Sequence, residues 1–269
     1  MVNADKNIKL KKIGLFDSGI GGFSILSELF KTLPQAEYYY ISDDAHAPYG
    51  PKSDEFITAR SIEISKQLMS LGVDLIVVAC NTATAASIDA LRSYFPNFIF
   101  VGVEPYLNAY YKIPETLNPV EKKMMVLTTV STGKSERFKR LKERLDPNSE
   151  IDHYGLPNLA RIIEEYYYAP TNFSELTKKI NDELSFLKNM NYSYAILGCT
   201  HYPLVKKQIE DSLIVKAISP CSHVASRVFS LLDIDSGEIN SEDFFYFLST
   251  KNNNWLKNKR ESILGPFQG

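Results

Sequence analysis

Apolar runs that each end at a polar or glycine-rich loop recur along this 269-residue chain. Near the N-terminus, the pattern predicts a buried strand over Ile13–Phe16, a loop over Asp17–Gly22 and an amphipathic helix over Phe23–Lys31. A second strand over Tyr38–Ile41 and a helix over Phe56–Met69 follow in the same way. This alternation of strand, loop and helix is typical of an α/β domain.

The next apolar run predicts a strand that is covered on both of its faces. Asp74–Ala79 is almost wholly apolar, as expected for a strand inside a parallel sheet, and the run ends on Cys80. Asn81 and Thr82 are good helix caps and alanines follow them, so we expect a helix to begin directly after the cysteine. A further strand is predicted over Phe98–Val103.

A second unit with the same pattern begins near residue 105. Met124–Leu127 predicts its first strand, followed by a loop over 128–135. Helices are predicted near 135–145, 157–168 and 173–189. A strand over Tyr194–Leu197 ends in Gly198-Cys199-Thr200-His201, and Pro203 fits the first turn of a helix. An apolar strand that ends at a cysteine thus occurs once in each half.

The chain is predicted to return to its first unit from about residue 217. Helix-like stretches are predicted there over 222–232 and 254–261. A length of 269 residues allows one large or two smaller cores, and we prefer two. We therefore predict two pseudosymmetric α/β domains, each a mainly parallel sheet flanked by helices. They comprise residues 1–105 with 217–269 and residues 106–216.

The composition of the chain limits the classes of molecule that we expect it to bind. A formal net charge of −2 with 23% charged residues provides no basic stripe, so we expect a small-molecule substrate and no nucleic acid. No apolar run reaches the roughly 18 residues that span a membrane, and the N-terminal segment lacks the apolar core of a signal peptide. We expect a cytoplasmic protein with no membrane partner. The three cysteines have neither disulfide-framework nor zinc-site spacing.

Two of those cysteines lie where open parallel sheets bind their ligands, outside the carboxyl ends of the strands. Asp17, Cys80, Thr129 and Cys199 all fall at such positions. A helix N-terminus lowers the pKa of a thiol, so we expect thiolate to be available near neutral pH. A carbon acid held between two such groups can lose its proton to one and regain a proton from the other, which inverts the stereocentre.

Polar residues on the same loops are candidates to support this reaction. A carbanion next to a carboxylate needs hydrogen-bond donors around it. Suitable donors are Ser18, Asn81, Thr82, Thr129, Thr132 and Thr200. His201 lies two residues from Cys199, and Asp17 ends the strand expected beside that of Cys80. The alternative roles for Asp17 and His201 are a turn cap and a surface histidine.

A dinucleotide-binding oxidoreductase is the alternative from another class. Gly19 and Gly21 follow a strand and precede a helix, and a second strand ends near Asp43, which approaches a dinucleotide fingerprint. Ser24 stands where the third glycine of that fingerprint belongs, and this interpretation gives neither Cys80 nor Cys199 a task.

Several motifs, taken in order, resemble the glutamate racemases within the aspartate/glutamate racemase group. They are FDSGIGG (16–22), APYG (47–50), VACNTATA (78–85), VGVEP (101–105), Thr129-x-x-Thr132-x-x-Ser135 and LGCTHYPL (197–204). The resemblance implies that glutamate binds at the domain interface without pyridoxal phosphate or metal. It also implies that Cys80 and Cys199 are catalytic, assisted by Asp17 and His201. The expected product, D-glutamate, would supply peptidoglycan synthesis.

The resemblance further implies a set of substrate-binding residues. These are Asp17, Ser18, Tyr49, Gly50, Asn81, Thr82, Thr132, Thr200 and His201. Glu164 resembles the acidic residue that the family places beside the site, although a solvated helix carboxylate beside Glu165 is the alternative. Where the family usually has Gly-Asp-Thr-Ala-Arg, this chain has Ser42-Asp43-Asp44-Ala45-His46. Cys221 matches no motif and is expected to be a buried thiol. Aspartate or another amino acid as the substrate, and a homodimer, stay open.

Overall fold

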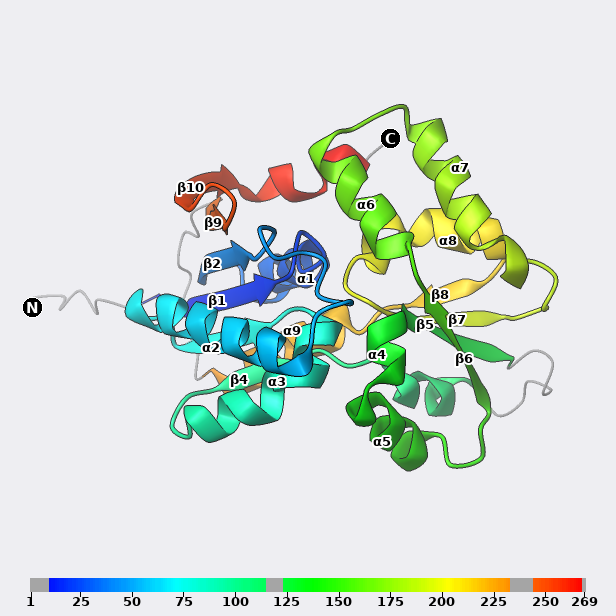
Figure 1. Cartoon of the computed structure of the whole chain (residues 1–269), viewed down its shortest axis with the longest axis horizontal. Helices are drawn as coiled ribbons and strands as arrows, with labels where there is room; N and C mark the ends of the chain where they lie inside the picture. Colours follow the sequence, from blue (N-terminus) through cyan, green and yellow to red (C-terminus); the bar gives the residue numbers. More distant parts are fainter. Residues whose placement is uncertain (1–9, 115–122, 233–243, 268–269) are drawn as a thin grey trace, which may run out of the picture.

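The computed structural model describes residues 10–114, 123–232 and 244–267. They form two sheets that lie side by side, each with helices packed against it (Figure 1). We call the six-stranded sheet with its helices the first lobe, and the four-stranded sheet with its helices the second lobe. The predicted α/β class, with two mainly parallel sheets flanked by helices, is confirmed.

The sheet of the first lobe has the strand order β10-β9-β2-β1-β3-β4. Its strands are β1 (Lys12–Asp17), β2 (Glu37–Ser42), β3 (Leu75–Val78), β4 (Phe100–Gly102), β9 (Phe244–Ser249) and β10 (Asn254–Lys259). All neighbouring pairs are parallel except β9 and β10. Because β1 and β3 are parallel neighbours, the residues that follow them, Ser18 and Cys80 among them, come to the same edge of the sheet.

Helices cover both faces of this first sheet. On one face α1 (Phe23–Thr32) packs with α9 (Cys221–Leu231), and on the other α2 (Asp54–Ser70) packs with α3 (Asn81–Tyr94). Side chains of β1 alternate accordingly, since Leu15 belongs to the apolar cluster that includes α1 and Phe16 belongs to the cluster that includes α2 and α3. A strand buried on both faces is what the continuous apolar runs predicted.

The second lobe is built on the parallel order β6-β5-β7-β8. Its strands are β5 (Met124–Thr129), β6 (Ile151–Leu156), β7 (Tyr194–Gly198) and β8 (Lys216–Ile218). Its α-helices are α4 (Val130–Lys134), α5 (Glu136–Leu145), α6 (Leu159–Tyr168), α7 (Phe173–Glu183) and α8 (Lys206–Leu213). Short 3₁₀ helices are η1 (Leu107–Lys112), η2 (Ser185–Leu187), η3 (Tyr202–Val205) and η4 (Arg260–Phe267). The chain crosses back to the first lobe after β8.

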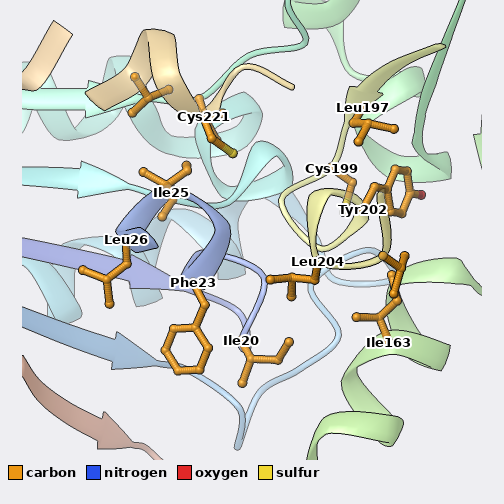
Figure 2. Close-up of a cluster of buried hydrophobic side chains, with 14 of the residues drawn as sticks. Ile20, Phe23, Ile25, Leu26, Ile163, Leu197, Cys199, Tyr202, Leu204 and Cys221 are labelled. Atoms are coloured by element: carbon orange, nitrogen blue, oxygen red, sulfur yellow. The ribbon is translucent and has the colours of Figure 1, made fainter. Parts of the chain in front are cut away.

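One apolar cluster joins the two lobes. Figure 2 shows Ile20 and Phe23 of the first lobe together with Ile163, Tyr202 and Leu204 of the second, all buried. Burial of large aliphatic and aromatic side chains is the main favourable contribution to packing two such units together. The cluster therefore fixes the loops that carry the polar residues of both lobes next to each other.

The predicted helix over 254–261 is wrong. This stretch forms β10, which pairs antiparallel with β9 after a tight turn in which Asn253 has φ 52°. Trp255 packs edge-on against Tyr39 of β2, while its neighbours along the strand are mostly exposed. Pairing with β9 and this aromatic contact decide the conformation, and neither is visible in the lysine- and asparagine-rich local pattern.

Other differences are smaller. The predicted helix near 173–189 ends at Glu183 and is followed by η2. The predicted loop over 128–135 contains the short helix α4. Strands β6, β8 and β9 were not predicted, because they are short or lack clear alternation of apolar and polar residues. Across the described ranges, no helix combines the length and the apolar character needed to cross a membrane.

Candidate active site

A cavity of about 300 Å³ opens where the carboxyl ends of both sheets meet. This volume is at the lower end of the range for small-molecule sites, roughly 300–1,000 Å³. The first lobe contributes Ser18, Gly19, Asp44, Ala47, Pro48, Tyr49, Gly50, Cys80, Asn81, Thr82 and Lys251 to its lining. The second lobe contributes Thr129, Ala160, Arg161, Glu164, Glu165, Cys199, Thr200 and His201.

Cys80 caps the N-terminus of α3 and is only 6% exposed. Its Sγ accepts a hydrogen bond from the backbone N–H of Ala83 (3.4 Å) and lies 3.8 Å from Ser18 Oγ. Burial, together with the negative charge of Asp17, raises the pKa of Cys80 to about 12. The expected lowering of its pKa by the helix N-terminus is thus wrong for Cys80, because the cost of burying a thiolate outweighs one backbone N–H.

Asp17 is fully buried at the end of β1. Its Oδ1 accepts from the backbone N–H of Gly19 (2.9 Å) and from Ser18 Oγ (3.3 Å), and its Oδ2 accepts from Thr200 Oγ1 (2.9 Å). Burial raises the pKa of Asp17 to about 6, although His201 and these hydrogen bonds oppose the rise. Asp17 therefore approaches Cys80 through Ser18 and ties the first lobe to Thr200 of the second.

Cys199 follows β7 and faces a different set of partners. Its Sγ lies 3.8 Å from Nδ1 of His201, and Nε2 of the same ring lies 2.6 Å from Oε2 of Glu164. Burial alone would lower the pKa of His201, but its contacts with Cys199 and Glu164 raise that pKa well above the ordinary value. The result is a buried chain of thiol, imidazole and carboxylate, an arrangement that stabilises negative charge on sulfur.

Glu164 also explains why the loop before α1 is rich in glycine. Its Oε2 accepts from the backbone N–H of Ile20 (3.0 Å), and a Cβ on Gly19 would collide with its carboxylate. A Cβ on Gly21 would likewise collide with the ring of His201. These glycines allow the second lobe to approach closely. A protein carboxylate occupies the place where a dinucleotide pyrophosphate would sit, which argues against the dinucleotide-binding alternative.

Amide and hydroxyl groups complete the polar lining. Asn81 donates from Nδ2 to Val103 O (3.3 Å), and its buried Oδ1 has no hydrogen-bond partner within the described part of the chain. Thr82 Oγ1 lies 3.3 Å from Thr129 Oγ1 and 3.2 Å from Thr132 Oγ1. Thr129 lines the cavity, whereas Thr132 lies behind it and supports Thr82 and Thr129.

The loop that departs from the family pattern holds Tyr49 in place. The Tyr49 hydroxyl donates to Oδ2 of the buried Asp43 (2.6 Å), and Arg60 binds both oxygens of that carboxylate. Burial alone would raise the pKa of Asp43, but hydrogen bonds from Arg60, Tyr49 and His46 lower it below its usual value. Gly50, next to Tyr49, lines the cavity itself.

Several lining residues were not among the predicted site residues. They are Gly19, Asp44, Ala47, Pro48, Ala160, Arg161, Glu165 and Lys251. Arg161 and Lys251 come from α6 and from the β9–β10 turn, which no local signal connects to the cysteines. Asp44 could have been suspected from its position three residues before the start of the APYG motif.

Cys221 lies outside this cavity. Its buried Sγ donates to Ser24 Oγ (3.4 Å) on the far side of α1, and burial raises its pKa. It is the buried thiol that the sequence predicted.

The fold and the site define a class of protein. It is an α/β protein in which two buried thiols line one cavity, one of them near a carboxylate and the other beside an imidazole. Such a pair is equipped for proton transfer at carbon. Residues 24–228 match the Asp/Glu/Hydantoin racemase family. The chain belongs to this family.

Similarity to individual relatives supports membership of this racemase family. The glutamate racemase of Aliarcobacter butzleri is 35% identical over 225 residues, which cover 82% of this chain and 83% of that protein. The glutamate racemase of Escherichia coli, solved with L-glutamate and an activator, superposes with a TM-score of 0.78 at 26% identity and covers 90% of this chain and 89% of that one. The enzyme of Francisella tularensis, solved with D-glutamate, has a TM-score of 0.71 at 29% identity, covering 96% and 93%.

Proposed function

We propose that this protein is a glutamate racemase that interconverts L- and D-glutamate by proton transfer between Cys80 and Cys199. The observation that carries the proposal is the convergence of both thiols, from strand ends of different lobes, on one cavity of about 300 Å³. Relatives solved with L-glutamate and with D-glutamate support the choice of substrate.

The surroundings of the two sulfurs differ in charge, which suggests how the reaction starts. Cys80, whose pKa burial raises to about 12, is the protonated member of the pair at neutral pH. Cys199 lies beside the His201 imidazole, whose raised pKa favours its cationic form. We therefore assign the thiolate of Cys199, beside this imidazole, as the base that starts the reaction. That thiolate removes the α-proton from one face, and the Cys80 thiol delivers a proton to the other.

Reaction in the opposite direction needs the opposite protonation state. After one turnover Cys80 is the thiolate and Cys199 the thiol, so the pair is ready for the other enantiomer. The backbone N–H of Ala83, 3.4 Å from Cys80 Sγ, is the donor that stabilises the Cys80 thiolate. Hydroxyl groups of Thr82 and Thr200 and the amide of Asn81 are placed to hold the substrate's α-carboxylate and ammonium groups, which keeps Cα between the two sulfurs.

Chiral chromatography of the purified protein with single enantiomers tests the proposed substrate. L-glutamate should be converted to an equal mixture of both enantiomers, and D-glutamate should reach the same mixture. L-aspartate, the nearest alternative, should react at least about tenfold more slowly, because loss of one methylene misplaces the distal carboxylate. Faster conversion of aspartate than glutamate would overturn the choice of substrate.

The biological role follows from the product. D-glutamate made by this enzyme would supply peptidoglycan synthesis, and we place that supply in the cytoplasm. A homodimer stays a prediction, which light scattering of the purified protein tests. The tyrosine run 166–168 gives it little support, since Tyr166 is buried and Tyr167 packs against Phe23 and Phe267 within the same chain.

A further inference from the structure

A serine on α1 binds the main chain of the candidate active site from outside the cavity. Ser24 Oγ lies 2.8 Å from the backbone carbonyl oxygen of Thr200 and 2.9 Å from that of Gly21, so its proton is shared between the two carbonyl groups. Ser24 is buried and does not line the cavity between the two lobes. Its hydroxyl therefore joins the loop after β1 in the first lobe to the loop after β7 in the second.

A thiol sets the direction in which this hydroxyl donates. Cys221 Sγ, at the start of α9, donates to Ser24 Oγ (3.4 Å). Because the oxygen accepts that bond, its own proton is directed at the two carbonyl groups. Ser24 and Cys221 line a second cavity, of about 520 Å³, that shares no lining residue with the candidate active site. The Thr200 carbonyl is thus held from a part of the molecule that is separate from that lining.

Thr200 is held at two points, and both partners belong to the first lobe. Its hydroxyl donates to Oδ2 of Asp17 (2.9 Å), and its carbonyl accepts from Ser24. The carbonyl belongs to the peptide group that links Thr200 to His201. A peptide group is planar, so this hydrogen bond fixes the orientation of the chain at the point where the His201 side chain begins. Rotation of the peptide group would move the imidazole even if the Asp17 contact stayed intact.

The imidazole of His201 has little freedom to move without losing its partners. Its Nδ1 lies 3.8 Å from Cys199 Sγ, and its Nε2 lies 2.6 Å from Oε2 of Glu164. Hydrogen bonds weaken steeply as their angle departs from linearity, so a small rotation affects both contacts. We propose that Ser24 is a positioning residue, whose hydroxyl holds the peptide group before His201 so that the imidazole stays beside Cys199. The inference rests on the proposed function.

Steady-state kinetics of Ser24→Ala tests this assignment. The kcat for L-glutamate should fall about tenfold while KM changes less than about twofold, because the substitution displaces an acid–base group and leaves the lining of the cavity in place. Ser24→Thr, which keeps the hydroxyl, should recover most of the wild-type kcat. The matched control is Ser65→Ala on α2, a buried serine whose Oγ donates to Ser61 O of the same helix (2.7 Å), and it should behave as wild type.

The pH profile of kcat separates positioning from a general loss of stability. Contacts with Cys199 and Glu164 raise the pKa of His201 well above its ordinary value. If these contacts loosen in Ser24→Ala, the pKa of His201 falls, and the imidazolium is lost at a lower pH than in the wild type. The alkaline limb of the profile should therefore move to lower pH by roughly half a unit or more. Wild-type kcat in Ser24→Ala, or a lowered kcat with the wild-type pH profile, would overturn the assignment.

Nuclear magnetic resonance of protein labelled with ¹⁵N-histidine follows the same imidazole without any substrate. The chain has four histidines, and the signals of His201 are those that disappear in His201→Asn. They should become those of the neutral ring at lower pH in Ser24→Ala than in the wild type or in Ser65→Ala. Equal titration of His201 in Ser24→Ala and the wild type would overturn this inference alone. If the wild type does not racemise glutamate, the proposed function fails, and the titration still decides whether Ser24 positions His201.

Discussion

The two cysteines occupy equivalent positions in the two lobes, yet their surroundings are opposite in charge. Cys80 begins the 14-residue helix α3, packs in an apolar cluster that belongs to the first lobe, and experiences the negative charge of Asp17. Cys199 precedes a short 3₁₀ helix, packs in the cluster that joins both lobes, and contacts His201. The strand-end positions of the two sulfurs are alike, but Cys80 has an anionic neighbour and Cys199 has an imidazole beside it.

This difference teaches that a pseudosymmetric fold need not give a symmetric acid–base pair. Under the proposed function, one thiol and one thiolate are needed at a time, and different electrostatic surroundings of the two sulfurs would favour one such state. Two cysteines with identical neighbours would have no preferred arrangement of the shared proton.

Replacing either sulfur should have the largest effect. Cys80→Ser and Cys199→Ser should each reduce racemisation of L-glutamate by at least about 10³-fold, because a serine hydroxyl is a far weaker acid than a thiol. Cys221→Ser is the matched control, since this buried thiol lies outside the cavity, and it should retain activity. Substantial racemisation by Cys80→Ser or by Cys199→Ser would contradict the proposal that both sulfurs transfer protons.

Removing the cationic neighbour of Cys199 should have the next largest effect. His201→Asn should lower kcat about 100-fold, because the imidazolium no longer stabilises the thiolate. His223→Asn provides a matched control at a histidine that packs against Tyr106 with tilted rings, and the kcat of this variant should stay unchanged. Equal rates for both variants and wild type would show that Cys199 does not depend on His201.

The negative charge near Cys80 comes from Asp17, and the protonation of this residue should make the unfolding free energy depend on pH. Its folded-state pKa, raised to about 6 from 3.8, means that the folded protein favours protonated Asp17. The associated stability is present below the unfolded pKa and is lost as pH rises through the folded pKa. Relative to Asp17→Asn, the wild type should therefore lose up to ~3 kcal/mol of unfolding free energy between about pH 4 and pH 6.5.

Urea unfolding of wild type and Asp17→Asn across this pH range measures the difference. The prediction concerns how the difference in unfolding free energy between the two proteins changes with pH. Its absolute size is not predicted, since the substitution also alters hydrogen bonds that do not titrate. A difference that stays constant with pH would contradict the raised pKa of Asp17.

The hydrogen bond between the lobes should have the smallest effect of this series. Thr200→Val removes the donor to Asp17 Oδ2 and should cost ~2 kcal/mol of unfolding free energy at pH 7.5, where Asp17 is ionised. Thr177→Val on α7 removes a hydroxyl that donates to Phe173 O of the same helix and should cost less than ~1 kcal/mol. Equal losses for the two variants would mean that the contact between the lobes contributes little.

Local sequence patterns identify those parts of the site that depend on strand ends. The apolar run before Cys80 and that before Cys199 predict strands, and parallel strands bring their carboxyl ends to one edge. The family resemblance identified Glu164 as well, but its contact with His201 depends on how α6 packs across the lobes.

The features that could not be predicted depend on tertiary packing. Lys251 reaches the cavity only because β9 and β10 form a hairpin, and the sequence of β10 suggested a helix. The raised pKa of Cys80 was missed for a similar reason, since the extent of burial around a helix N-terminus is set by both lobes together.

The central claim is that one sulfur removes the α-proton and the other delivers a proton to the opposite face. The most direct test measures deuterium at Cα during the first turnovers in deuterated water. Incubation of L-glutamate with the wild-type protein should give D-glutamate that carries solvent deuterium at Cα, while the remaining L-glutamate keeps its hydrogen, because the acid and the base are different groups on opposite faces. D-glutamate that keeps the substrate's own hydrogen would show a single group acting on both faces and would contradict the assignment of Cys80 and Cys199.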